Sequence, residues 1–87
     1  MEKKLHLFVV TQDATVFDAD VKYVNAPTPS GSLGILYGHT PMVCALTRGV
    51  LRCAYAGEEG AVIEVSGGIL EVSDNVVTVL AKDARVM

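Results

Sequence analysis

Apolar and polar residues alternate with a period of two through most of this 87-residue chain, and no window of helical length carries a 3.6-residue apolar stripe. Gly, Asn and Asp, which favour turns, separate the alternating segments. Many short strands with closely spaced turns are typical of an antiparallel sandwich or barrel. We therefore predict an all-β fold, an antiparallel β-sandwich. The candidate strands are Leu5–Val10, Val16–Ala19, Val21–Asn25, Leu33–Leu36, Met42–Leu46, Val50–Ala56, Ala61–Val65, Ile69–Ser73 and Val76–Ala81.

Three residue pairs are candidate two-residue hairpin loops, and each fixes a register because residues opposite each other in a hairpin share a face. A loop at Asp74-Asn75 pairs Val72 with Val77 and Leu70 with Val79. A further turn is predicted at Gly57-Glu58-Glu59-Gly60.

The other two loops are predicted at Arg48-Gly49 and Gly67-Gly68. The first places Cys44 opposite Cys53, close enough for a disulfide under mild oxidation. The second sets two acidic residues, 64 and 71, opposite each other at a cost of a few tenths to ~1 kcal/mol, so this loop is expected to be longer or bulged.

These registers predict which apolar residues form the core and which stay outside. The predicted core contains Leu46, Leu51, Cys53, Ile63, Val65, Leu70, Val72, Val77 and Val79. Four apolar residues remain on the outer faces: Val50, Ile69, Val76 and Leu80. Part of that surface is expected to meet a partner.

Size and composition limit the possible functions. Hydrophobic residues make up 51% of the chain, and its length suits one domain over residues 1–87. The net charge of −3, without a basic stripe, argues against a nucleic-acid partner. No apolar run approaches the ~20 residues that span a bilayer, so direct membrane insertion is not expected. The N-terminus lacks a secretory signal, which favours an intracellular chain.

Residues for catalysis are scarce. The two histidines, His6 and His39, have no obvious carboxylate partner in the local pattern. A zinc site from His39, Cys44 and Cys53 would lack the four closely spaced ligands of a structural site. We therefore expect no catalytic residue, no metal, no cofactor and no small-molecule substrate. A generic β-sandwich interaction module and a small metal-binding protein of the cupin type remain as alternatives.

All three prolines, Pro27, Pro29 and Pro41, bracket a segment rich in both glycine and apolar residues. Proline favours extended structure before it, and glycine permits backbone angles closed to other residues. We predict an ordered excursion with a short strand. It either caps the sandwich with its apolar residues turned inward or presents them to a partner.

Three stretches resemble one known family. The segment PTPSGSLGILYGHTPMVCALTRGVLR is similar to the family pattern P-T-x-x-G-x-L-G-I-L-P-G-H-A-P-L followed by V-L-R. The segment VSGGILEVSDNVVTVLAKDA resembles its closing V-S-G-G-F-L-E-V-x-x-N-x-V-T-V-L-A-D-x-A, and LHLFVVTQDATVFDADVKYV fits its opening strands. The chain is thereby identified as similar to the N-terminal domain of the epsilon subunit of F-type ATP synthases.

The resemblance implies a ten-stranded β-sandwich at the foot of the central stalk of the rotor. Such a domain catalyses nothing; it docks on the gamma subunit and the c-ring and couples proton or ion flow to ATP synthesis. As part of that complex it would be peripheral, on the cytoplasmic face of the inner (plasma) membrane. The implied gamma contacts are Thr11, His39, Thr40, Pro41 and Met42. The implied c-ring loop is Ser30, Gly31, Ser32, Leu33, Gly34, Ile35, Leu36, Tyr37 and Gly38.

The chain departs from the family pattern at several positions. Ser32 stands where the family often has Glu, Tyr37 replaces the usual Pro, and Arg48 replaces the Pro of a Pro-Gly turn. These changes bear on loop rigidity and on the charge of the ring contact. Most family members continue into a C-terminal helical hairpin that can inhibit ATP hydrolysis. The sequence given ends at Met87, before such an arm, as either a short subunit or a part of a longer one.

Overall fold

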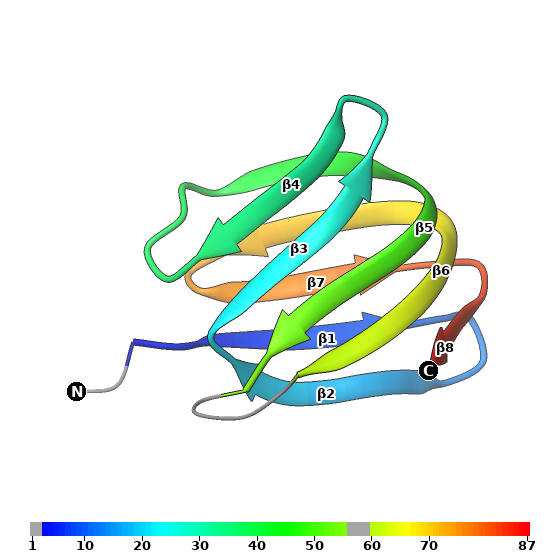
Figure 1. The fold of residues 1–87 in the computed structure, drawn as a ribbon, viewed down its shortest axis with the longest axis horizontal. Helices are drawn as coiled ribbons and strands as arrows, with labels where there is room; N and C mark the ends of the chain where they lie inside the picture. The colour runs from blue at the N-terminus through cyan, green and yellow to red at the C-terminus, as the bar shows by residue number, and fades with distance from the viewer. Residues whose placement is uncertain (1–2, 56–59) are drawn as a thin grey trace.

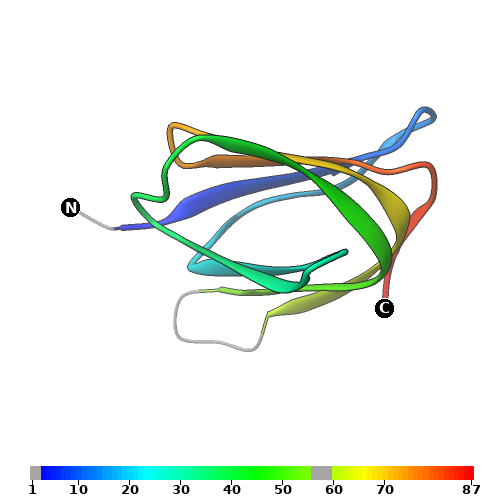
Figure 2. The ribbon, with the colours of Figure 1, turned by 90° about the horizontal axis from the view of Figure 1, so that it is seen from above.

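Two curved layers of β-sheet face each other in the computed structural model, which describes residues 3–55 and 60–87 (Figure 1 and Figure 2). Every regular element in this part of the chain is a strand, which confirms the predicted all-β class. The strands are β1 (Leu5–Val10), β2 (Thr15–Val21), β3 (Tyr23–Thr28), β4 (Gly31–Leu36), β5 (Met42–Ala54), β6 (Ala61–Ser73), β7 (Val76–Leu80) and β8 (Ala84–Val86).

The two longest strands, β5 and β6, have 13 residues each and run through both layers. Their first and second halves pair with different neighbours. One layer has the order β2-β1-β7-β6-β5, with the second half of β6 against β7. The other has the order β4-β3-β5-β6-β8, with the second half of β5 against β3. All pairs are antiparallel except β1 with β7, which is parallel.

The continuity of β5 and β6 overturns two predicted loops. Arg48 pairs with Ser66 and Gly49 with Val65, so neither Arg48-Gly49 nor Gly67-Gly68 reverses the chain. The two glycines of β6 have φ values of +104° and +134°, and they bend the strand from one layer into the other. Alternation is the same in a bent strand and in a hairpin, so the pattern alone did not separate them.

Several predicted pairs are therefore wrong. Cys44 lies opposite Leu70 and Cys53 opposite Ala61, so the two cysteines do not face each other. The predicted repulsion between residues 64 and 71 does not arise either. Glu64 instead pairs with Val50 of β5 and with Arg85 of β8.

The hairpin at Asp74-Asn75 is confirmed, with its predicted register. These residues have φ values of 52° and 63°, as a two-residue turn with both central residues in the left-handed region requires. Asp and Asn tolerate that region better than other non-glycine residues, so the local sequence was enough to predict this turn.

Other differences concern strand boundaries. The second and third strands are separated at Lys22 and not at Asp20. The strand β4 begins earlier than predicted, and the short strand β8 is absent from the predicted set. The described residues form eight strands, and the two long strands, β5 and β6, each contribute one segment to each layer. Residues 56–59, which hold the end of one predicted strand and most of the predicted turn before β6, lie outside the described residues.

The core lies between the two layers and is aliphatic. All nine residues predicted for it are buried. The inner faces of β1, β3 and β4 add further buried residues that the hairpin registers did not include: Leu5, Leu7, Val9, Val24, Ala26 and Ile35. Ile35 brings the glycine-rich segment into the core.

Candidate docking surfaces

An apolar row crosses the outer face of the layer formed by β1, β7, β6 and β5. Ile69 lies between Leu80 and Ala45, and Leu80 lies opposite Val10. Ile69 and Leu80 are 51% and 54% exposed, and Val43, two positions before Ala45 on β5, is 66% exposed. We call these five residues the apolar stripe. Contiguous apolar surface of this kind is typical of a binding site.

The stripe includes two of the four apolar residues that the sequence placed outside. Ile69 and Leu80 are exposed as predicted, whereas Val50 and Val76 are half-buried. Alternation does not bring Val10 and Val43 into the stripe, because their place in it depends on which strands lie beside β1 and β5. The β7 residues that pair with β1 lie 70 positions further along the chain, and no local signal contains that pairing.

The segment predicted as a c-ring loop, Ser30–Gly38, is mostly the strand β4, and it forms a hairpin with β3 (Figure 1). The hairpin turn is held by Thr28, whose hydroxyl donates to the Gly31 carbonyl at 2.6 Å and accepts from the Ser30 amide at 3.2 Å. Ile35 points into the core, while Leu36 is 64% exposed. The segment is therefore ordered and contains a strand, as predicted, and it points its apolar residues in both directions.

The connection from β4 to β5 is held by the β6–β7 turn. The Gly38 amide donates to the Asn75 side-chain oxygen at 2.7 Å, and the Asn75 carbonyl accepts from the His6 amide at 3.0 Å. The His39 amide also donates to the Leu36 carbonyl at 3.1 Å. These bonds fix the shape of the segment that leads into the predicted gamma contacts.

The five predicted gamma contacts fall into two groups. In the β4–β5 connection His39 is half-buried and Thr40 and Pro41 are exposed, and Met42, the first residue of β5, is half-buried. Thr11 lies in the β1–β2 turn, where its hydroxyl accepts from two backbone amides at 3.3 Å. That turn is at the opposite end of the sandwich from the β4–β5 connection (Figure 1 and Figure 2).

The apolar stripe joins these two groups. One of its ends is Val10, next to Thr11, and the other is Val43, next to Met42. A partner laid across the stripe would reach both groups at once.

A charged cluster lies on the same outer face, at the β1–β2 pair. The His6 ring nitrogens lie 2.7 Å from Asp20 Oδ1 and 2.5 Å from Asp18 Oδ1, and Lys4 Nζ is 3.2 Å from Asp20 Oδ2. The hydrogen bonds to Asp20 and then to Asp18 raise the pKa of His6 above its ordinary 6.5. The expectation that His6 lacks a carboxylate partner is wrong. The contact depends on the pairing of β1 with β2, which sets His6 opposite Asp20.

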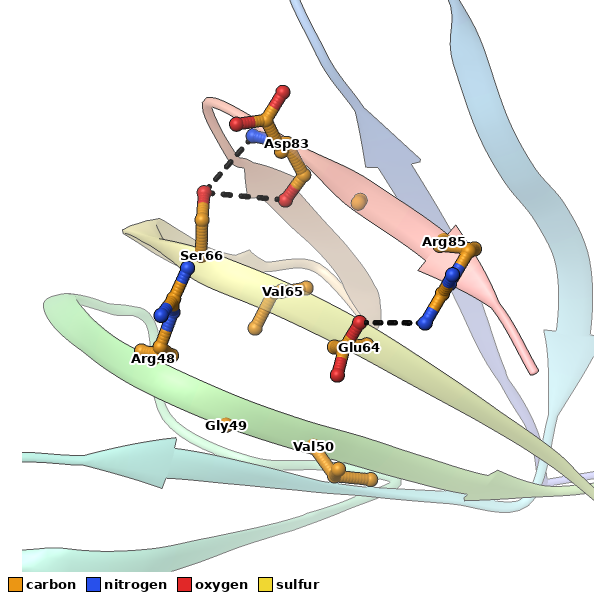
Figure 3. Close-up of a pocket in the computed structure, with 9 residues that line it drawn as sticks. Arg48, Gly49, Val50, Glu64, Val65, Ser66, Asp83 and Arg85 are labelled. Atoms are coloured by element: carbon orange, nitrogen blue, oxygen red, sulfur yellow. Dashed lines mark hydrogen bonds and ion pairs between the residues drawn. The ribbon is translucent and has the colours of Figure 1, made fainter.

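A hollow of about 470 Å³, lined by both charged and apolar residues, lies over the other layer, where β8 joins β6 (Figure 3). Ser66 Oγ donates to the Asp83 carbonyl at 3.2 Å and accepts from its amide at 2.9 Å, and Arg85 pairs with Glu64 at 3.0 Å. These bonds attach β8 to β6. Arg48, at the family's proline position, is an exposed strand residue on the rim.

The described residues assemble no group of three His, Cys, Asp or Glu side chains that could hold a metal ion. Two of the considered zinc ligands, Cys44 and Cys53, lie in the two different halves of β5. Over residues 3–55 and 60–87, no helix is long and apolar enough to cross a membrane.

The two-layer fold defines a β-sandwich domain. Residues 4–86 match the sequence model of one family, described as "ATP synthase, Delta/Epsilon chain, beta-sandwich domain". The chain belongs to this family, which confirms the resemblance seen in the sequence.

Similar proteins agree with this assignment. The chain is 51% identical over 85 residues to the ATP synthase epsilon chain of Nitratidesulfovibrio vulgaris (strain DSM 19637 / Miyazaki F), covering 98% of this chain and 63% of the relative. It is 44% identical over 83 residues to the ATP synthase epsilon chain of Priestia megaterium, covering 95% and 61%. The chain thus spans about three-fifths of the length of these relatives. A chain in the Euglena gracilis mitochondrial ATP synthase (OSCP/F1/c-ring) superposes with a TM-score of 0.90 at 27% identity, covering 99% of this chain and 55% of that one.

Proposed function

We propose that this chain is the β-sandwich domain of a noncatalytic central-stalk (rotor) subunit of an F-type ATP synthase. It docks on the gamma subunit and on the c-ring, and so helps to couple proton or ion flow to ATP synthesis. Family membership supports the class of protein, and the similar Euglena chain comes from an assembly that includes F1 and the c-ring. The domain is then peripheral to the membrane, on the cytoplasmic face of the inner (plasma) membrane.

The observation that carries the gamma contact is the apolar stripe. It exposes three large aliphatic side chains and links Thr11 at one end to the segment His39–Met42 at the other. Fully burying one such side chain is worth ~1.5–3 kcal/mol, so covering three half-exposed ones contributes ~3 kcal/mol, or more than a hundredfold in affinity. A surface rigidified by strand pairing loses little entropy on binding.

The c-ring contact is assigned to the β3–β4 hairpin and the connection after it, Ser30–Gly38. This segment is ordered at both ends, by the Thr28 hydrogen bond at the β3–β4 turn and by the Gly38–Asn75 hydrogen bond after β4, so it meets a neighbour without rearranging. The exposed Leu36 and Tyr37 supply apolar contact there. Ser32 carries no charge, so this contact should depend little on salt.

Substitution within the stripe tests the gamma contact. Ile69→Asp should weaken binding to purified gamma at least tenfold in titration calorimetry, because the contact would bury a carboxylate without a partner. Val86→Asp, on β8 in the other layer, is the matched control and should bind like the wild type. Equal affinities for the wild type and Ile69→Asp would refute the assignment of this face.

A parallel test addresses the c-ring. Leu36→Asp should reduce co-sedimentation with detergent-solubilised c-ring while leaving gamma binding unchanged. A variant that loses both partners equally would show that the two surfaces are not separate.

A further inference from the structure

Both ring nitrogens of His6 face carboxylate oxygens. Nδ1 lies 2.7 Å from Asp20 Oδ1, and Nε2 lies 2.5 Å from Asp18 Oδ1. A neutral imidazole carries one N–H, so its other nitrogen would place a lone pair against a carboxylate oxygen. The imidazolium ion donates from both nitrogens and satisfies both contacts. This geometry therefore suits a doubly protonated ring.

Among the described residues, few other charged groups lie near His6. Lys4, directly before β1, pairs with Asp20 at 3.2 Å. On the other side β7 places Val76 opposite His6, and Thr78 lies one row further. The nearby β6–β7 turn carries Asp74, which is exposed and makes no ion pair with His6 among the described residues. With His6 protonated the four charges of the cluster cancel, and loss of the proton leaves one net negative charge.

The Phe8 side chain lies beside the His6 ring on the outer face of β1. Its ring centroid is 4.5 Å from that of His6, with the planes tilted by 50°. A cation near an aromatic ring is favoured over a neutral group. The same arrangement disfavours a metal ion, because the two carboxylates lie at opposite ring nitrogens and an ion at either one would meet a single carboxylate.

The strand β2, which carries both aspartates, is the edge strand of its layer. β2 pairs with β1 alone within the sheet order, and three of its seven residues are exposed. Its attachment depends on one ladder of backbone bonds, on the buried Val21 and the partly buried Phe17, on contact with β8, and on the two aspartates that reach His6. Terminal strands of this kind open locally before the core does.

We propose that His6 acts as a proton-dependent clamp, holding the edge strand β2 on β1 when protonated and releasing part of that hold when neutral. The clamp requires no partner, so it stands independently of the role proposed above. Its effect has a definite sign. Because the folded-state pKa of His6 is raised, the added stability is complete below the unfolded pKa of about 6.5 and is lost as pH rises through the folded value.

Titration of the histidine ring signals by NMR tests the clamp directly. In the folded chain His6 should titrate at a higher pH than in the same chain unfolded in urea. Asp18→Asn and Asp20→Asn should each move its titration toward the unfolded value, and the double variant should move it further. Asp13→Asn removes the same charge from the β1–β2 turn, where its carboxyl makes no ion pair among the described residues, so it should leave the His6 titration unchanged. A His6 that titrates at or below its unfolded value in the wild type would overturn the proposal.

Amide hydrogen exchange measures the consequence for β2. Between about pH 5 and about pH 8, after correction for intrinsic exchange, β2 should lose protection in the wild type while the core strands β6 and β7 keep theirs. His6→Gln should show low β2 protection at both values, with no pH-dependent change. Equal pH dependence in the wild type and His6→Gln would contradict the clamp. Should His6→Gln not fold, the wild-type titration alone decides.

Discussion

Gly68 lies where β6 passes from one layer to the other, and an alanine there should destabilise the whole sandwich. Its φ of +134° is in a region that L side chains rarely adopt. A Cβ built at this position would be 2.0 Å from the Leu80 carbonyl oxygen and 3.0 Å from Ala81 Cα. Both neighbours are backbone atoms at the end of β7, so they cannot move aside as a flexible side chain could.

The magnitude follows from two costs. A non-glycine residue forced into such a backbone region costs ~1–3 kcal/mol. Displacing the end of β7 also endangers the bond from the Ala81 amide to the Val10 carbonyl, 3.0 Å, which is worth ~1 kcal/mol. Together these two costs should lower the free energy of unfolding by ~3 kcal/mol, a large part of the ~5–15 kcal/mol typical of a domain.

Thermal and urea unfolding, followed by circular dichroism, measure the loss. For a chain of this size, ~3 kcal/mol lowers the melting temperature by ~12–24 °C. Gly34→Ala is the matched control: this glycine is also within a strand, but apart from its own chain neighbours no atom of the described structure lies within 4 Å of its Cβ position. It should change the stability by less than ~0.5 kcal/mol. Equal stabilities for the two variants would refute the view that Gly68 bends a continuous strand.

The remaining predictions concern local structure. Asn75→Ala should destabilise the chain by ~1–2 kcal/mol in urea unfolding, because it removes the hydrogen bond to Gly38 and strains the backbone at a positive φ. Asn75→Gly should lose only the hydrogen bond, so equal losses for the two variants would contradict the contribution of backbone strain. Mild oxidation should leave Cys44 and Cys53 as free thiols in mass spectrometry, since they are nine positions apart along β5, and an internal disulfide would contradict the strand. Thiol labelling should be slower at Cys53, because burial raises its pKa. Hydrogen bonds to His6 and then to Lys4 lower the pKa of Asp20, so its contribution to stability is present above the unfolded pKa and is lost as pH falls through the folded value. Asp20→Asn should therefore lose less stability on acidification than the wild type in urea titrations.

The faces of the strands could be predicted without any structure. Alternation is a local property, since successive side chains of an extended chain point to opposite sides whatever the strand pairs with. Leu70 and Val72 were therefore placed in the core correctly from a hairpin at Asp74-Asn75. Leu51 and Ile63 were also placed correctly, although the loops assumed for them do not exist.

Family resemblance supplied the candidate contact loops, alternation supplied the outward apolar residues, and the structure supplied the arrangement of both. Ile69 and Leu80 were recognised as outward apolar residues from alternation alone. The Asp74-Asn75 hairpin sets Ile69 opposite Leu80. The continuation of the row to Val10 depends on β1 joining β7 in parallel, and its continuation to Val43 depends on the pairing of β5 with β6. Such pairings connect distant parts of the chain and leave no mark in a short window.

The amino-acid sequence by itself determined the all-β class, the buried faces and the one turn whose two residues tolerate the left-handed region. Only the tertiary structure decided that Gly67-Gly68 bends a strand and does not reverse it, and that His6 meets Asp18 and Asp20. The physical reason is the same in both cases. Local geometry sets where each side chain points, whereas the choice of neighbour depends on which distant strands complete the hydrogen-bond ladders and bury the most apolar surface together.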